Sequence, residues 1–257
     1  MPAPRLPERL RRLPVAHRAF HSRESRRPEN SRAAIRAAMS AGYAIEIDLQ
    51  LSADGHAMVF HDDDLDRLTD TAGPVRARTA AQLRAIPLKD ADEGIPDFAE
   101  VLALVQGRVP LLVEIKDQDG AVGPGVGVLE AAAARLLASY AGDVAVMSFN
   151  PHSMAEMARL VPRVPRGLTT WEWTAAEWPP LNEAACSNLR EIPDYDRVGA
   201  SFLSHHWKDL GRARVAELAA RGADVLCWTI RSPEAETEAR RIACNITFEG
   251  YAAPLPA

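Results

Sequence analysis

The chain has 257 residues, of which 47% are hydrophobic, and a formal net charge of −5. This length supports a large core, and a single domain over residues 1–257 is expected, as is normal for a barrel of this size. No apolar run approaches the roughly 20 residues of a membrane span, and no apolar segment follows the N-terminal arginines as in a secretory signal. The acidic balance offers no general basis for nucleic-acid binding.

The three cysteines, Cys186, Cys227 and Cys244, are odd in number and lack the spacing of a metal finger. This pattern is typical of reduced thiols in a cytoplasmic protein. We therefore expect a cytoplasmic protein with a small-molecule substrate, no nucleic-acid partner and no stable membrane insertion. The oligomeric state is unknown from the sequence.

The first polar cluster follows a short apolar segment. Residues 14–17 read as a buried strand that ends in His17, and Arg18 comes directly after it. Pro28, Glu29, Asn30 and Ser31 follow, and Asn30 or Ser31 is expected to cap a helix over residues 32–41 that stops at Gly42.

Residues 43–61 predict a strand and its hairpin return. Isoleucine and leucine at odd positions alternate with polar residues at even positions from Glu46, which indicates a strand with one polar face. Asp54-Gly55 is a strong signal for a two-residue turn. That register places Asp48 directly opposite His61, with Cβ atoms about 5 Å apart.

Glu46 and Asp48 share the polar face of this strand. Two carboxylates beside an imidazole suit a hard metal ion next to a proton-transfer group. The alternative is a solvated hairpin with an acidic outer face. Farther along, the apolar run over 109–115 is broken by Glu114 and ended by Lys116 and Asp117, charges that are costly to bury without partners.

Eight strand signals occur along the chain, most of them separated by segments of helical character, and they predict an α/β fold of the TIM-type (β/α)8 barrel class. Residues 56–61 form a hairpin return, and residues 62–96 form an insertion after the second strand, followed by a helix to about Gln106. The eight predicted strands are 14–17, 43–49, 110–115, 143–148, 166–170, 199–204, 224–229 and 245–248. Polar residues follow many strand ends, which places them on the face that carries active sites in such barrels.

The polar motifs described above, from His17-Arg18 to Lys116, resemble those of the glycerophosphodiester phosphodiesterase family in their order and spacing. The resemblance covers the first half of the chain with specific motifs and is looser beyond residue 117, where it rests on Ser148-Phe149-Asn150, Trp228-Thr229-Ile230 and Ile246-Thr247. The motifs of the first half are His17-Arg18, Pro28-Glu29-Asn30, Glu46-Ile47-Asp48, Asp54-Gly55, His61-Asp62 and Glu114-Ile115-Lys116.

The resemblance implies a TIM-type barrel and specific roles for seven residues. One divalent metal ion, Mg or Ca, would be held by Glu46, Asp48 and Glu114. His17 and His61 would form an acid/base pair, and Arg18 and Lys116 would contact the phosphate. Three departures concern substrate choice more than chemistry. Ala19 stands where the family commonly has Gly, and Arg231 stands where it commonly has Asn. The last strand reads Thr247-Phe248-Glu249, where the family's last strand usually ends Thr-Asp.

Several residues have simpler alternatives. The three acids could form only salt bridges with Arg18 and Lys116, and Glu29 could serve to orient Arg18. His205-His206 could face the pocket or cap a strand. The tryptophans after the fifth strand favour packing over a substrate platform; they are Trp171, Trp173 and Trp178.

The sequence thus predicts a phosphoric diester hydrolase that converts glycerophosphodiesters to glycerol phosphate and an alcohol by metal-dependent His/His catalysis. The alternatives are lysophospholipase-D-like cleavage of a lipid that keeps one acyl chain, and a non-catalytic phosphate- or lipid-binding barrel. The latter would be marked by the loss of a histidine or a ligand acid, and none is lost.

Overall fold

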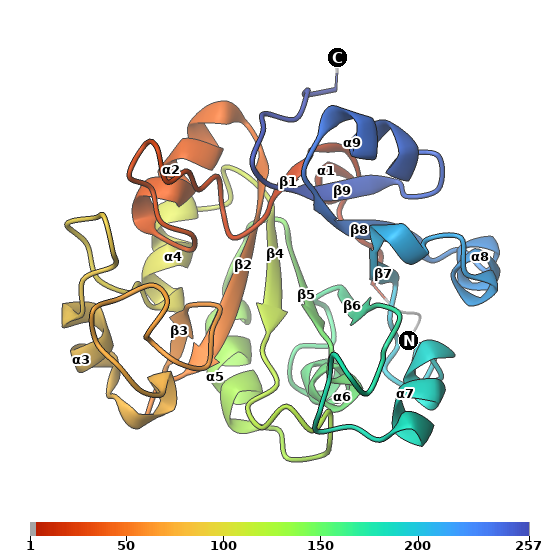
Figure 1. Ribbon diagram of the computed structural model, residues 1–257, viewed down its shortest axis with the longest axis horizontal. Coiled ribbons are helices and arrows are strands. Elements are labelled where there is room, and N and C mark those ends of the chain that lie inside the picture. The colour runs from red at the N-terminus through yellow and green to blue at the C-terminus, as the bar shows by residue number, and fades with distance from the viewer. Residues whose placement is uncertain (1–3, 257) are drawn as a thin grey trace.

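Eight parallel strands close into a barrel in the computed structural model, which describes residues 4–256 (Figure 1). β1 closes the ring because Val15 pairs with Ala44 on one side and with Thr247 on the other. The prediction of a (β/α)8 barrel is confirmed. The barrel strands are β1 (Val15–Ala16), β2 (Ala44–Leu51), β4 (Leu111–Ile115), β5 (Val144–Ser148), β6 (Arg166–Thr170), β7 (Phe202–His206), β8 (Asp224–Ile230) and β9 (Asn245–Phe248).

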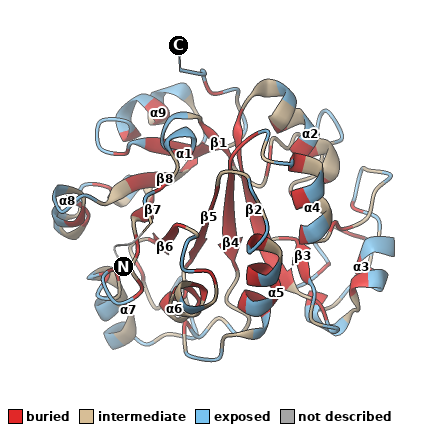
Figure 2. Ribbon diagram, turned by 180° about the vertical axis from the view of Figure 1, so that it is seen from behind, coloured by how far each residue is buried: buried red, intermediate tan, exposed pale blue. Residues whose placement is uncertain are grey.

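Helices surround the strands and turn their exposed faces outward (Figure 2). Ser31 caps α2 by accepting a hydrogen bond from the backbone N–H of Ala34, and Gly42 ends the helix at φ 80°, a left-handed conformation that glycine adopts without strain. No helix in residues 4–256 has the length and apolar character needed to cross a bilayer. The helices are α1 (Glu8–Arg12), α2 (Arg32–Ala41), α3 (Ala80–Ala85), α4 (Phe98–Val105), α5 (Val128–Leu137), α6 (Pro151–Leu160), α7 (Glu183–Arg190), α8 (Ala213–Ala220) and α9 (Pro233–Ala239).

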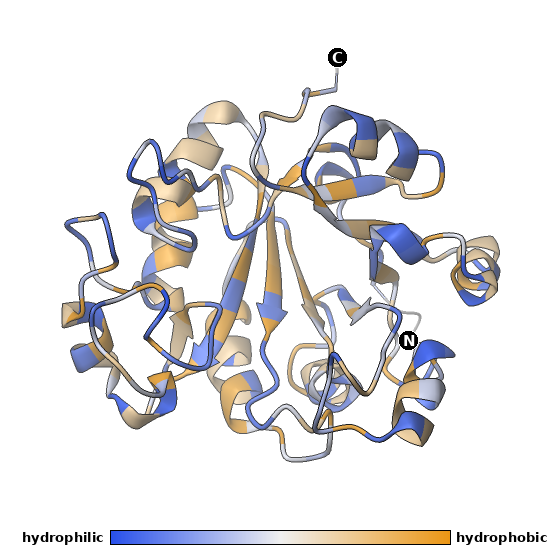
Figure 3. Cartoon of the chain, viewed as in Figure 1, coloured by the Kyte–Doolittle hydropathy of each residue, from blue (hydrophilic) through white to orange (hydrophobic). Residues whose placement is uncertain are grey.

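The alternation along β2 sorts its side chains between two environments. Ile45, Ile47 and Leu49 belong to the large apolar cluster that also includes residues of the helices. Ala44 belongs to a second apolar cluster, which packs Leu10 of α1 against inner strand residues at the amino end of the barrel. Glu46 and Asp48 share the period-two positions of Ala44 and therefore form a charged layer above this second cluster. Figure 3 shows blue, hydrophilic bands along the otherwise largely orange β2.

The hairpin after β2 forms, but its predicted register is wrong by one residue. β3 (Ala57–Val59) pairs with β2 through Gln50 opposite Met58. The turn has three residues, Ala53 to Gly55, because Ser52 donates its backbone N–H to the carbonyl of His56 and Gly55 adopts φ 81°. Asp48 therefore lies opposite Phe60, and its backbone carbonyl accepts a hydrogen bond from the backbone N–H of Phe60. His61 follows the end of β3, and its side chain lines the pocket.

Residues 62–96 form the predicted insertion. It has a small apolar core of its own, in which Leu65 and Leu83 pack against Met58 of β3. Its packing fixes the segment that carries Asp62 and Arg67 beside the carboxyl end of the barrel.

Candidate active site

Three carboxylates converge at the carboxyl end of the barrel. Asp48 of β2 pairs in register with Glu114 of β4, and Glu46 lies two residues earlier on β2. One oxygen from each lies within 4.8 Å of the others, and the three residues are only 1%, 1% and 6% exposed. Three buried carboxylates at this spacing form an oxygen-rich site of the kind that hard divalent cations prefer.

Glu46 has one satisfied and one unsatisfied oxygen. Its Oε2 accepts a hydrogen bond from the backbone N–H of Arg18 at 2.7 Å, whereas its buried Oε1 has no hydrogen-bond partner within residues 4–256. Burial, followed by repulsion from Asp48 and Glu114, raises the pKa of Glu46 well above its ordinary value. A cation between the three acids would remove this repulsion.

Asp48 is neutralised by cations. Lys116 Nζ lies 2.8 Å from its Oδ1 and 2.6 Å from Oε1 of Glu114, and Arg18 Nε lies 3.8 Å from its Oδ2. Asn30 also donates to Oδ2 at 2.9 Å. Burial raises the pKa of Asp48, but Lys116, His61 and Arg18 outweigh it and hold the pKa far below its usual range.

The sequence allowed the alternative that all three acids form only salt bridges with Arg18 and Lys116. Asp48 and Glu114 do form such salt bridges, but Glu46 does not. Three carboxylates face two cationic side chains, and the orphaned oxygen belongs to the uncompensated acid. The donor set therefore fits a metal ion as well as a salt-bridge network, and a buried unpaired acceptor is the costlier arrangement without one.

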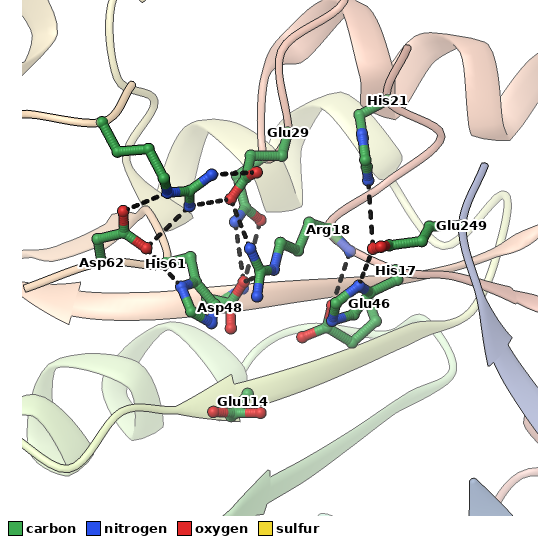
Figure 4. Close-up of polar contacts among 12 residues, drawn as sticks. His17, Arg18, His21, Glu29, Glu46, Asp48, His61, Asp62, Glu114 and Glu249 are labelled. Atoms are coloured by element: carbon green, nitrogen blue, oxygen red, sulfur yellow. Dashed lines mark hydrogen bonds and ion pairs between the residues drawn. The ribbon is translucent and has the colours of Figure 1, made fainter. Parts of the chain in front are cut away.

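His17 is oriented by an acid from the last strand's end. Its Nδ1 lies 2.6 Å from Oε2 of Glu249 (Figure 4). The other oxygen of Glu249, Oε1, accepts a hydrogen bond from Nε of Arg231 at 2.7 Å. Burial lowers the pKa of His17, while the hydrogen bond to Glu249 opposes that effect. Because Nδ1 is engaged by Glu249, Nε2 remains for proton transfer.

His61 is oriented in the same way by its neighbour. Its Nδ1 lies 2.7 Å from Oδ1 of Asp62, and Arg67 binds both oxygens of Asp62 at 2.6 and 2.8 Å. Arg67 also binds Glu29, whose Oε1 accepts from Nη1 of Arg18 at 2.9 Å. A continuous chain of ion pairs therefore links His61 to Arg18, and Glu29 orients Arg18 as one alternative expected.

All seven predicted site residues line one pocket of about 190 Å³. Phe149 and Trp228 form an apolar part of its wall. The seven residues are His17, Arg18, Glu46, Asp48, His61, Glu114 and Lys116. Charge, proton-transfer groups and an apolar wall thus meet in a single small cavity.

Four residues that hold the site together had no role in the site assigned from the sequence. Asn30 and Asp62 stand inside the quoted motifs, so their neighbours pointed to them. Glu249 appeared only as a departure from the family, and Arg67 carried no local signal. Glu249 and Arg67 lie far in sequence from the groups they hold, and only the folded chain brings them together.

His205 and His206 lie in different environments. His206 lines the pocket and pairs with Glu172 at 2.7 Å, whereas His205 is buried between Thr170 and Asp209. The expectation of packing for the tryptophans agrees with an aromatic cluster behind Phe149, in which Trp173 is 1% exposed. Ala19 adopts φ 64°, a conformation that glycine would adopt without strain, at the position where the family commonly has Gly.

Comparisons with known proteins agree with this geometry. Residues 17–247 match the model of the glycerophosphoryl diester phosphodiesterase family. A glycerophosphodiester phosphodiesterase of Caldanaerobacter subterraneus is 33% identical over 62% of this chain and 67% of its own, and one of Bacillus subtilis is 28% identical over 73% and 67%.

The fold has a solved counterpart. The structure of an Oleispira antarctica phosphodiesterase in complex with the product sn-glycerol-3-phosphate superposes with a TM-score of 0.75 at 23% identity, covering 93% of this chain and 94% of the other. The expectation of a phosphoric diester hydrolase is confirmed by the family match, which spans most of the chain. The chain belongs to the glycerophosphoryl diester phosphodiesterase family.

Proposed function

We propose that the protein hydrolyses glycerophosphodiesters to glycerol phosphate and an alcohol, with one divalent metal ion, Mg or Ca, held by Glu46, Asp48 and Glu114. The observation that carries the proposal is the pocket itself, which joins three buried carboxylates, two cationic side chains and two histidines. The unpartnered Oε1 of Glu46 supports a cation in the cluster. When bound, the metal supplies Lewis-acid polarisation of the phosphate.

The phosphate is an anion that repels nucleophiles, so its negative charge must be compensated. Arg18 offers a planar fork to two phosphate oxygens, and Lys116 offers a point charge. Attraction to Asp48 and Glu114 outweighs burial and raises the pKa of Lys116, so the amine stays protonated at neutral pH. Both cations are already held in place by carboxylates before substrate arrives, which limits the reorganisation needed in the reaction.

The two histidines divide the proton transfers. His17 Nε2 takes the proton of the attacking oxygen, and His61 gives a proton to the departing alcohol oxygen as the P–O bond breaks. Burial keeps His17 largely neutral at neutral pH, as a base requires. The attacking oxygen comes from water or from the substrate's own glycerol hydroxyl, and the same base serves either route.

The size of the pocket favours a small diester over a lysophospholipid. At about 190 Å³ it is smaller than the roughly 300–1,000 Å³ typical of sites for larger ligands. Phe149 and Trp228 do provide an apolar wall, which is the feature a lysophospholipase-D-like activity would use. The presence of both histidines and all three acids argues against a non-catalytic binding barrel.

The test is a panel of diesters given to purified protein. Glycerophosphodiesters with different alcohols, a lysophospholipid and a simple alkyl phosphodiester are each assayed for release of the alcohol and of the matching phosphate monoester, which is glycerol phosphate for the first class only. Each assay is run with chelator and again after Mg or Ca is restored. We expect metal-dependent turnover that is greatest for glycerophosphodiesters. Absence of turnover on every diester in the presence of metal would refute the proposal.

A further inference from the structure

A second cavity, of about 630 Å³, lies beside the active site and is larger than the hydrolytic pocket. Its wall comes from the loop after β1, from the insertion and from the segment after β9. Glu29 separates the two spaces, because it binds Arg18 on the active-site side and Arg67 on the cavity side. The seven predicted active-site residues are absent from its lining.

The cavity is basic although the whole chain is acidic. Five cationic side chains line it against three carboxylates, whereas the chain has a net charge of −5. Glu29 is already occupied by Arg18 and Arg67. The five cations are Arg23, Arg26, Arg27, Arg67 and Lys89.

Four of these cations lack a carboxylate partner within residues 4–256. Arg26 donates only to the carbonyl of Asp90, and Lys89 only to the carbonyls of Asp66 and Arg67. Arg23 and Arg27 have no side-chain hydrogen bond or ion pair in the same range, and Nε of Arg27 is buried without a partner. The carboxylates of Glu24 and Asp90 form no ion pair with them. Uncompensated guanidinium groups around a cavity are the recognition chemistry of phosphoryl groups.

The loop that carries the arginines is held in shape without a ligand. Ser22 and Arg27 exchange two backbone hydrogen bonds of 2.9 Å, and the guanidinium carbon of Arg27 lies 5.5 Å from the centre of the Phe20 ring. Arg27 is therefore oriented by a cation–π contact, which leaves its hydrogen-bonding capacity unused. His21 lines the same cavity, and its Nε2 lies 3.6 Å from Oε2 of Glu249 (Figure 4).

We propose that this cavity binds a phosphoryl dianion other than the phosphodiester that is hydrolysed. The side chains of the lining carry a net charge of +2, which matches the two negative charges of a phosphate monoester, and the guanidinium groups of Arg23 and Arg27 can each bind two of its oxygens. The phosphoryl group is either free phosphate or a second phosphate on the alcohol of the substrate. Binding of a free dianion does not depend on hydrolysis, so it can fail or succeed separately from the proposed function.

The test measures pyrophosphate and inorganic phosphate binding by calorimetry on chelator-treated protein. The variant is Arg23→Gln/Arg27→Gln, and the matched control, Arg135→Gln/Arg163→Gln, removes two charges from exposed residues that line neither cavity. We expect wild type and control to bind alike and the cavity variant to lose one binding equivalent or at least tenfold in affinity. Equal binding by all three proteins, or no binding by any, would overturn the proposal.

Two further measurements complete the test. Arg23→Gln alone, at an exposed residue without side-chain partners in the described chain, keeps the result interpretable if the double variant unfolds, and it should also weaken binding. The source of the phosphate follows from kcat/KM for a diester whose alcohol carries a phosphate monoester, relative to the same diester without it. A preference that the cavity variant loses identifies the substrate's second phosphate, and no preference together with lost binding identifies free phosphate.

Discussion

Nδ1 of His17 lies 2.6 Å from Oε2 of Glu249, a residue 232 positions later in the chain. The contact joins the end of the first barrel strand to the end of the last, which are neighbours only because the barrel closes. It orients the imidazole and also changes its acidity. Burial lowers the pKa of His17, and Glu249 raises it.

Replacement of Glu249 by Gln is therefore expected to move the acidic limb of the kcat/KM profile to lower pH. A base works when it is deprotonated, and loss of the carboxylate removes the interaction that favours the protonated imidazole, so the pKa of His17 falls further. The measurement is kcat/KM from pH 4 to pH 9 for wild type, Glu249→Gln and the exposed control Glu238→Gln. An acidic limb that stays in place or moves to higher pH would contradict the assignment of His17 as base.

Chelation is expected to abolish activity, and Glu46→Gln is expected to weaken metal binding at least tenfold. Loss of an outer-shell partner of a metal typically costs about 10–100-fold in affinity, and loss of a direct ligand should cost no less. Calorimetric titration with Mg and Ca gives the affinity without reference to activity. Glu236→Gln is the control, because it changes another buried carboxylate, which pairs with Arg240 outside the pocket. Full turnover in excess chelator would remove the metal from the mechanism.

Arg18→Ala and Lys116→Ala should each raise the free-energy barrier by about 2–4 kcal/mol if their charges act on the phosphate in a water-poor site. The loss should appear in kcat/KM, while Arg36→Ala, at an exposed residue of α2, should leave it unchanged. Lys116 is also an ion-pair partner of Asp48 and Glu114, so thermal unfolding is measured alongside. Unchanged catalytic efficiency in a folded variant would return these residues to a structural role.

The two histidines should respond differently to the leaving group. An alkoxide is a poor leaving group and needs a proton, whereas nitrophenolate hardly does, so His61→Ala should slow a glycerophosphodiester by about 10²–10⁴-fold and a nitrophenyl phosphodiester much less. His17→Ala should slow both. Turnover of each variant on both substrates gives the comparison. Equal losses on both substrates for both variants would remove the acid/base division.

The local pattern of the sequence determined the barrel and the seven residues of the pocket. Period-two alternation and apolar runs indicate strands because each side chain must face either the core or a polar layer, and this depends on neighbours two residues apart. The polar positions of β2 could therefore be placed beside Glu114 as soon as the strands were known to be adjacent and parallel. Family motifs within a few residues of each other then supplied their roles.

Tertiary structure decided the features that depend on distant partners. Asp54-Gly55 locally favours a two-residue turn, but the hairpin has a three-residue turn that ends at Gly55. The pairing of β2 with β3 and the packing of Met58 in the core of the insertion fix this register. The contact between Glu249 and His17 forms only because the barrel closes. The contact between Arg67 and Glu29 forms only because the insertion packs beside the barrel. The basic cavity has the same origin, because no short stretch of sequence records which charges remain unpaired after folding.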